Sequence, residues 1–460
     1  MDSSKLSWLT ATDAARALRD GALSAEELVE ACLARIEEAD PAIEAWAHLD
    51  PEHARAQARA RDADRREGRA IGPLHGVPVG IKDIFDTADM PTEDGTVLHA
   101  GRMPAQDAAV VAMLRAAGAV IMGKTVTTEC ATYTPGKTRN PHNPEHTPGG
   151  SSSGSAAAVA AGMVPLALGS QTNGSVIRPA AFCGVFGFKP THGLIPRAGV
   201  LKLSRALDHV GVFARSLDDV ALISESIVGC DAADPDTRPR ARPDFRRLAA
   251  EEPPLPPLLA FARTPLWQRT DADLREAFAE LVEHLGERVV ELDLPAVTNH
   301  ALDWHRTIME SEMAANLDAE WTRGRDRLSA SLRSQLERGR QVTALDYQQA
   351  LARIPLINAG FDEIFERCDA ILTPAAPGAA PKGLDATGDP SFCTLWTLAG
   401  MPAISLPLMQ AESGLPIGVQ LVGPRGSDAR LLRTARWLVN AVAADAQREP
   451  VGTDQGGLER

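Results

Sequence analysis

Short apolar runs that alternate with helical segments are the feature that most constrains this fold. Val77 to Ile81, Ala119 to Met122 and Val164 to Leu168 are apolar, and glycine-containing turns separate them from the helices between them. Uninterrupted apolar runs of this length are typical of strands buried on both sides. Three later runs have the same character: Ala370 to Leu372, Ala403 to Leu408 and Val419 to Val422. The pattern predicts one large α/β domain.

The predicted strands form two blocks with a helical stretch between them, which divides the 460-residue chain into four parts. We expect N-terminal helices over 1–70, the catalytic core over 71–230, a linker and mostly helical insertion over 231–366, and a return to the core sheet over 367–460. Together they form a single domain, 1–460. Residues 231–257 are rich in proline, aspartate and arginine, so neither a helix nor a strand is expected there.

Charge and cysteine usage restrict the partners and the compartment. With a net charge of −14, the chain is a poor stand-alone binder of nucleic acid and of anionic membranes, so neither partner is expected. None of the six cysteines is in a CxxC pair, which favours reduced, buried thiols. The first six residues, Met1 to Leu6, do not read as a secretory signal, so a cytoplasmic protein is expected.

Two short motifs match known patterns but lie in unsuitable surroundings. Residues 118–125, Gly-Ala-Val-Ile-Met-Gly-Lys-Thr, match a phosphate-binding loop, yet the middle of the motif is itself a predicted strand. Gly118 is expected to end the preceding helix instead. Residues 150–154, Gly-Ser-Ser-Ser-Gly, match a nucleophile elbow, but an irregular loop with two prolines precedes them in place of a strand. No metal-ligand spacing such as HExxH is present.

A second serine-glycine cluster lies where a strand ends and a helix begins. Residues 170–179 read Ser-Gln-Thr-Asn-Gly-Ser-Val-Ile-Arg-Pro, and Pro179 suits the first turn of a short helix running to Gly184. Successive N–H groups in such a turn can point at one spot and stabilise an oxyanion, although a polar surface turn explains the pattern equally well. A serine nucleophile needs a base. Lys82, at the end of the apolar strand, is the candidate, with pairing to Asp83 or exposure to solvent as the alternative.

These segments together resemble the amidase signature family, over nearly the whole chain. The motifs that carry the resemblance are the 76–83 strand Gly-Val-Pro-Val-Gly-Ile-Lys-Asp, the 148–158 loop Pro-Gly-Gly-Ser-Ser-Ser-Gly-Ser-Ala-Ala-Ala, the Ser175 segment, 187–191, and the closing motifs at 400–403 and 414–421. The resemblance implies a mixed, twisted β-sheet covered by helices on both faces. It also implies a catalytic set of Lys82 as base, Ser151 as bridging serine after a cis Gly150–Ser151 bond, and Ser175 as nucleophile. The backbone N–H groups of Thr172, Asn173, Gly174 and Ser175 would form the oxyanion hole, and no cofactor is implied.

The chain departs from the common family pattern around the nucleophile. Gln171 stands where the family commonly has aspartate, which should alter the hydrogen bonding of the loop, and Asn173 stands where a glycine is common. Asparagine tolerates a positive φ, so Asn173 is expected to keep the turn. The arginine of the motif, Arg178, lies one place later than usual. The shifted arginine resembles the branch that includes malonamate- and carboxybiuret-hydrolysing enzymes, in which Arg178 and Gln171 would contact a carboxylated substrate. A structural ion pair with Asp83 or Asp208 is the alternative for Arg178.

The expected function is hydrolysis of a carbon–nitrogen bond in a small-molecule amide or carbamate (urethane) through a Ser175 acyl-enzyme. The helical stretch 300–366 lies where family members vary their substrate pockets, and the sequence does not choose among amides, anilides and carbamates. A homodimer is one candidate assembly. The alternative function is the amidase-type subunit of a tRNA-dependent amidotransferase complex, against which the departures at Gln171 and Arg178 argue. A non-enzymatic relative that binds amides is a third hypothesis, disfavoured because Lys82, Ser151 and Ser175 are all retained.

Overall fold

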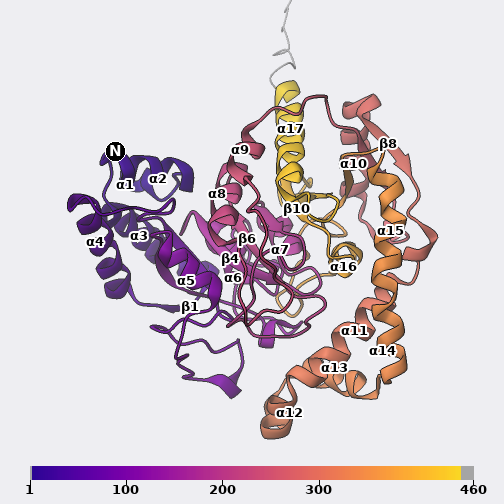
Figure 1. The fold of residues 1–460 in the computed structure, drawn as a ribbon, viewed down its shortest axis with the longest axis horizontal. Coiled ribbons are helices and arrows are strands. Elements are labelled where there is room, and N and C mark those ends of the chain that lie inside the picture. The colour runs from indigo at the N-terminus through magenta and orange to yellow at the C-terminus, as the bar shows by residue number, and fades with distance from the viewer. Residues whose placement is uncertain (1–2, 447–460) are drawn as a thin grey trace, which may run out of the picture.

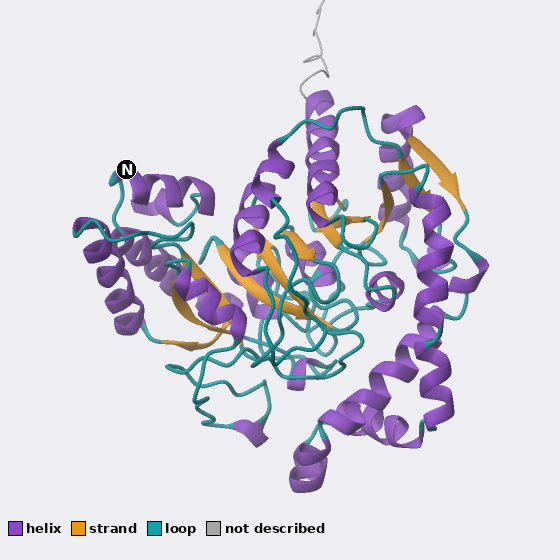
Figure 2. Cartoon of the chain, in the orientation of Figure 1, coloured by secondary structure: helices purple, strands orange, loops and turns teal. Residues whose placement is uncertain are grey.

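A single eleven-stranded sheet organises the molecule (Figures 1 and 2). The computed structural model describes residues 3–446. Met1 and Asp2, at the start of the segment that does not read as a secretory signal, lie outside the described residues. In spatial order the strands are β1-β3-β2-β4-β6-β5-β10-β11-β9-β7-β8. Their bounds are β1 Trp46–Leu49, β2 Pro78–Lys82, β3 Val120–Thr125, β4 Leu166–Gln171, β5 Phe186–Lys189, β6 His209–Ala214, β7 Leu259–Ala262, β8 Val289–Leu292, β9 Ala370–Pro374, β10 Ala403–Gln410 and β11 Pro416–Val422.

The sheet is mixed. Strand β2 runs parallel to both β3 and β4, and β7 runs parallel to both β8 and β9, whereas the other neighbours are antiparallel. All residues of β2, β3 and β4 are buried, as their uninterrupted apolar runs predicted. Because the carboxyl ends of parallel neighbours meet at one edge, Lys82 and Gln171, the last residues of β2 and β4, come to the same side of the sheet. The fold class predicted from the sequence, a large mixed α/β sheet surrounded by helices, is confirmed.

Helices pack around the sheet along most of the chain (Figure 2). Their bounds are α1 Ser3–Leu6, α2 Ala11–Asp20, α3 Ala25–Ile43, α4 Pro51–Arg66, α5 Ala109–Ala116, α6 Ser153–Ala160, α7 Ile177–Cys183, α8 Leu217–Ile227, α9 Phe245–Ala250, α10 Ala272–Leu285, α11 Ala301–Asn316, α12 Asp318–Gly324, α13 Ala330–Gln341, α14 Ala344–Leu351, α15 Arg353–Phe365, α16 Ser391–Leu398 and α17 Asp428–Ala446. None of the helices within residues 3–446 has the length and apolarity needed to cross a membrane.

Two local expectations are wrong, and a third is incomplete. The N-terminal region is not wholly helical, because Trp46–Leu49 forms strand β1 and pairs with β3. The linker contains the helix α9, whose Asp244 cap and buried Phe245 anchor it. The helical insertion also contributes strands β7 and β8 to the far edge of the sheet. Strands β1 and β7 depend on pairing with distant parts of the chain, which the local composition does not reveal, whereas α9 is capped locally by Asp244.

The cysteines differ from expectation at one position. All six are free, and five are buried as predicted, but Cys230 is exposed shortly after the end of α8. Within the described residues, no group of three or more His, Cys, Asp or Glu side chains is arranged to hold a metal ion.

Candidate active site

Lys82 lies at the carboxyl end of β2 and is fully buried. Its Nζ is hydrogen-bonded to Ser151 Oγ at 2.7 Å and to Ser170 Oγ at 2.8 Å. Neither alternative for this lysine is realised, since it neither pairs with Asp83 nor reaches solvent. Burial lowers the pKa of Lys82 well below its usual value, and the charge of Asp208 opposes this shift only in part. A lysine with a lowered pKa is available as a neutral amine, the form that can accept a proton.

Ser151 follows a cis peptide bond, Gly150–Ser151, as the family resemblance implied. The next residue joins this loop to the turn that carries Ser175, because the Ser152 N–H donates to the Ser175 carbonyl at 3.4 Å. The Ser152 hydroxyl is bonded to the backbone N–H and carbonyl of Ser170. Ser152 is the central serine of the elbow-like motif, so that motif serves here to hold the 150–154 loop against β4 and not as a hydrolase elbow.

The turn from Thr172 to Ser175 has an unusual distribution of hydrogen bonds. Its four carbonyl groups all accept one: Thr172 from His305 Nε2 (2.8 Å), Asn173 from Thr397 Oγ1 (2.6 Å), Gly174 from the Arg178 N–H (3.0 Å) and Ser175 from the Ser152 N–H. The backbone N–H groups of Thr172, Asn173, Gly174 and Ser175 donate to no acceptor within residues 3–446. Free N–H groups on consecutive residues beside a serine are the arrangement that stabilises an oxyanion.

Gln171 closes the base of this turn. Its side-chain oxygen accepts hydrogen bonds from the N–H groups of Val176 (2.8 Å) and Ile177 (3.0 Å), and its nitrogen donates to Thr397 Oγ1 (2.9 Å). The residue is fully buried. Every one of these contacts lies within the protein, and they tie the end of β4 to the first turn of α7. The neutral amide explains the departure from aspartate, because it supplies a donor that a carboxylate lacks.

Asn173 keeps the turn by a different route from the one expected. The φ of Asn173 is not positive, so the expectation of a left-handed conformation is wrong. Its side chain instead donates to the Tyr133 hydroxyl (2.9 Å) and accepts from Thr394 Oγ1 (2.7 Å). The side chain therefore anchors the turn to α16 and to the 128–134 loop.

Arg178 is almost completely buried in the first turn of α7. One guanidinium nitrogen donates to the Gly150 carbonyl (2.8 Å) and to Thr387 Oγ1 (3.0 Å), while Nε and Nη1 have no partner. The carboxylates considered as partners are engaged elsewhere, Asp83 with Lys124 and Asp208 with Thr172. Burial lowers the pKa of Arg178 from its usual value. Two buried, unmatched N–H donors beside the Gly150–Ser151 bond suit an anionic group.

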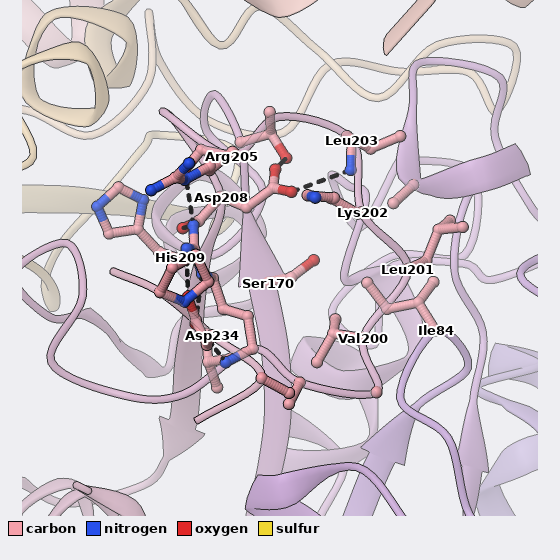
Figure 3. A pocket seen from close by; sticks show the side chains of 18 residues that line it. Ile84, Ser170, Val200, Leu201, Lys202, Leu203, Arg205, Asp208, His209 and Asp234 are labelled. Atoms are coloured by element: carbon pink, nitrogen blue, oxygen red, sulfur yellow. Dashed lines mark hydrogen bonds and ion pairs between the residues drawn. The ribbon is translucent and has the colours of Figure 1, made fainter. Parts of the chain in front are cut away.

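A cavity of about 240 Å³ is lined in part by Ser170, the hydrogen-bond partner of Lys82 (Figure 3). Its lining includes Ser170 near the end of β4, Thr172 just after it, Asp208 just before β6 and His209 at the start of that strand. Asp208 accepts hydrogen bonds from the Thr172 hydroxyl (2.6 Å) and from the N–H groups of Leu203 and Ser204. Burial raises the pKa of Asp208 to about 6, against the effect of the Thr172 hydroxyl. The cavity therefore adjoins Ser170, which is bonded to Lys82, and Asp208, which is bonded to Thr172.

The phosphate-loop motif is a structural element. Residues 120–125 form β3, and Gly118 has a φ of +89° just after α5 ends. Lys124 is fully buried, and its Nζ donates to Phe85 O (2.9 Å) and Thr92 Oγ1 (2.5 Å) while lying 3.3 Å from Asp83. A lysine held in this way by the 83–92 loop has no free face for a phosphate.

Sequence reasoning missed several residues that contact the site. Ser170, His305 and Thr397 all bond to it, and Asp208 was considered only as a partner for Arg178. Ser170 carried a usable signal, because residues at the carboxyl ends of neighbouring parallel strands meet. His305 and Thr397 carried none, since they lie more than a hundred positions from the turn, His305 on an amphipathic helix and Thr397 on a helix that is buried along its whole length.

Comparison with known proteins identifies the class. The model of the family described as Amidase matches residues 27–432. Among curated proteins, the chain is 37% identical to the A subunit of glutamyl-tRNA(Gln) amidotransferase from Chloroflexus aggregans, over 93% of this chain and 95% of that protein. Among solved structures it is similar to the peptide amidase of Stenotrophomonas maltophilia, with a TM-score of 0.82 and 31% identity over 97% of this chain and 99% of that one. A chain from a structure described as a vestigial protein complex that reveals the evolutionary origins of an s-triazine catabolic enzyme gives a TM-score of 0.87 at 27% identity, over 94% of this chain and 98% of that one. The chain belongs to the amidase family and is an enzyme that acts on amides.

The comparisons correct one expectation about partners. The chain was expected to act on a small molecule alone, without nucleic acid, because of its net charge of −14. Curated proteins this similar are subunits of an enzyme named for its action on a glutamyl-tRNA, so the expectation is wrong. The physical reason is that the net charge of one subunit says nothing about a complex in which another subunit contacts the RNA.

Proposed function

We propose that the chain hydrolyses a carboxamide through an acyl-enzyme on Ser175. The observation that carries the proposal is the hydrogen bond of 2.7 Å between the buried Lys82 Nζ and Ser151 Oγ. Neutral Lys82 takes the proton of Ser151 while Ser151 takes that of Ser175, and Ser175 Oγ attacks the carbonyl carbon. The free N–H groups of Asn173, Gly174 and Ser175 stabilise the oxyanion.

The second half of the reaction reverses the proton path. The proton held by Lys82 returns through Ser151 to the nitrogen of the leaving group, which departs as ammonia or an amine. Water then attacks the acyl carbon with the same residues acting as base. Its deprotonation and the departure of Ser175 as the leaving alcohol regenerate the resting site. Every proton in this scheme moves between groups of the chain, the substrate and water, and no cofactor takes part.

For the setting of this chemistry, the curated relatives favour the amidase-type subunit of a tRNA-dependent amidotransferase over a stand-alone hydrolase. Identity of 36–37% extends over more than nine-tenths of the chain for the relatives from Chloroflexus aggregans and Symbiobacterium thermophilum. In this setting Ser175 releases ammonia from an amide donor, and partner subunits use it. We therefore propose this role as the first to test, in a cytoplasmic complex whose reducing surroundings match the six free cysteines.

A stand-alone hydrolase of carboxylated amides is the second candidate, and Arg178 favours it. Its Nε and Nη1 are buried without partners, and each carries N–H groups that are free to donate to a substrate carboxylate. The similarity to a peptide amidase and to a 6-aminohexanoate cyclic dimer hydrolase also supports the hydrolysis of an amide. Carbamates remain within this candidate as alternative substrates.

The experiment measures ammonia or amine release by the purified chain from glutamine, a carboxylated small amide, an anilide and an aryl carbamate. Ser175→Ala is the test variant, and Ser226→Ala, on α8 with its hydroxyl bonded to the Leu222 carbonyl, is the matched control. We expect Ser175→Ala to abolish turnover and Ser226→Ala to retain it. Full activity in Ser175→Ala rejects the proposal.

A reconstitution separates the two settings. The chain replaces the amidase-type subunit in the purified Chloroflexus aggregans amidotransferase, and amidation of glutamyl-tRNA(Gln) is measured with glutamine as donor. Glutamine-dependent amidation supports the role within a complex. Failure to amidate, together with rapid turnover of the carboxylated amide by the isolated chain, assigns the stand-alone role instead.

A further inference from the structure

The turn that carries the nucleophile is held from outside by two helices that lie far away in the sequence. Helix α11 supplies His305 and helix α16 supplies Thr397, and these two helices pack against each other (Figure 1). His305 Nε2 is 2.8 Å from the Thr172 carbonyl oxygen, and Thr397 Oγ1 is 2.6 Å from the Asn173 carbonyl oxygen. Both side chains are buried.

A hydrogen bond to a carbonyl also fixes the N–H of the following residue. The two groups belong to one planar peptide, and in a trans peptide they point in opposite directions. The His305 bond therefore sets the direction of the Asn173 N–H, and the Thr397 bond sets that of the Gly174 N–H. These are two of the N–H groups that have no acceptor within the described residues. A bond to the carbonyl also polarises the peptide and strengthens its N–H as a donor.

The protonation of His305 is determined by its partner. A carbonyl oxygen only accepts, so Nε2 must carry a hydrogen. Burial lowers the pKa of His305 to about 4, and the bond to Thr172 opposes this only partly. The ring is therefore neutral at neutral pH and adds a directed donor without adding a charge beside the turn.

We propose that His305 and Thr397 are positioning residues of the oxyanion hole, which aim the N–H groups of Asn173 and Gly174 at the carbonyl oxygen of the substrate. This inference rests on the proposed function and deepens it. It assigns a catalytic contribution to the helical insertion, through a residue that contacts neither the substrate nor the nucleophile. Thr397 Oγ1 donates to the Asn173 carbonyl and also accepts a hydrogen bond from the side-chain amide of Gln171, so it links the two ends of the turn.

Paired variants test each contact. His305→Leu removes the donor, whereas His305→Gln retains an N–H donor on a side chain of similar reach. Thr397→Val removes the hydroxyl at nearly constant shape, whereas Thr397→Ser retains it. The matched control is His300→Leu, the same substitution at the exposed residue before α11, whose ring contacts Trp304 and not the turn.

Two readouts are used. The first is turnover of the best amide in the panel above. The second needs no known substrate: it is the rate at which a fluorophosphonate labels Ser175, followed by intact mass. In that reaction serine Oγ displaces fluoride at phosphorus, the serine proton passes toward Ser151, and the phosphoryl oxygen occupies the oxyanion site.

Loss of one oxyanion donor lowers kcat by about 10²–10³-fold, so misdirecting one should lower kcat and the labelling rate by about 10- to 100-fold. We expect this loss for His305→Leu and Thr397→Val, with KM changed less than about threefold because the ground-state carbonyl depends less on the oxyanion donors. His305→Gln, Thr397→Ser and His300→Leu should stay within about threefold of wild type by the same argument. Thermal unfolding of all variants is measured alongside.

The outcomes separate this inference from the proposed function. If wild-type Ser175 is not labelled, or if Ser175→Ala keeps full turnover, the proposed function itself fails. If Ser175 is required but His305→Leu and Thr397→Val label and turn over like His300→Leu, the positioning role is wrong. A loss that the conservative variants do not restore, or one that follows the loss of thermal stability, also overturns it, because that pattern belongs to a structural role.

Discussion

Lys82 Nζ lies 2.7 Å from Ser151 Oγ and 2.8 Å from Ser170 Oγ, and within residues 3–446 no carboxylate forms an ion pair with it. A buried ammonium without a counter-ion is costly, whereas a neutral amine between two hydroxyls is not. This relationship explains why the pKa of Lys82 is lowered, and it is the basis of the pH dependence predicted below.

The first prediction concerns the base. Lys82→Met should lower kcat/KM by about 10²–10⁴-fold, the usual contribution of a general base. Since only neutral Lys82 accepts a proton, wild-type activity should rise with pH through the lowered pKa of this residue. The measurement is the pH profile of kcat/KM. An acidic limb that survives in Lys82→Met would show that another group titrates.

Asp208 should tune that pH profile. Its negative charge favours protonated Lys82, and its own pKa is raised to about 6, so it is mostly ionised at neutral pH. Asp208→Asn removes the charge, which should lower the pKa of Lys82 further and move the acidic limb of kcat/KM to lower pH. A shift toward higher pH contradicts the assignment. Thermal unfolding measures the loss of stability expected when the asparagine amide nitrogen replaces the carboxylate oxygen that accepts from the Leu203 and Ser204 N–H groups.

Gln171 should matter for stability through the start of α7. Gln171→Leu leaves the Val176 and Ile177 N–H groups without an acceptor, and each buried unsatisfied donor costs about 1–3 kcal/mol. Gln171→Glu keeps the acceptors and loses only the donor to Thr397, so its free energy of unfolding should be much closer to that of wild type. Chemical denaturation measures both variants. Equal stability of Gln171→Leu and wild type contradicts the capping role.

Arg178 should discriminate between substrates if it binds an anion. Arg178→Met should raise KM for a carboxylated amide by about 10- to 100-fold, the value of a hydrogen bond to a charged group, and change KM for a neutral amide far less. Steady-state kinetics on the two substrates make the comparison. An equal loss on both assigns Arg178 to the support of the Gly150 carbonyl alone.

Nucleotide binding at residues 118–125 should be absent. Lys124 is fully buried, and its Nζ is already bonded to Phe85 and Thr92. Calorimetric titration with Mg-ATP should give no saturable heat. Saturable binding that Lys124→Met abolishes in a folded variant would contradict this account of the motif.

The sequence predicted the elements that have a distinctive local residue pattern. The apolar runs of β2, β3, β4, β9, β10 and β11 were found because a buried strand needs continuous apolar residues. Strands β1, β5, β6, β7 and β8 were not predicted. All of them except β6 have only four residues, and β1 and β7 each pair with a strand distant in sequence. The residues of the site divide in the same way: a lysine in an apolar strand is conspicuous, while His305 on an amphipathic helix is not.

The contact between His305 and the Thr172 carbonyl has a consequence for protein engineering. Residues 300–366 look like an exchangeable module, the kind that is swapped between relatives to change substrate preference. A replacement segment without a histidine at the position of His305 would supply a new pocket. It would also remove the hydrogen bond that holds the Thr172 carbonyl. Chimeras should therefore be designed with α11 retained from the recipient and the exchange confined to residues beyond Asn316.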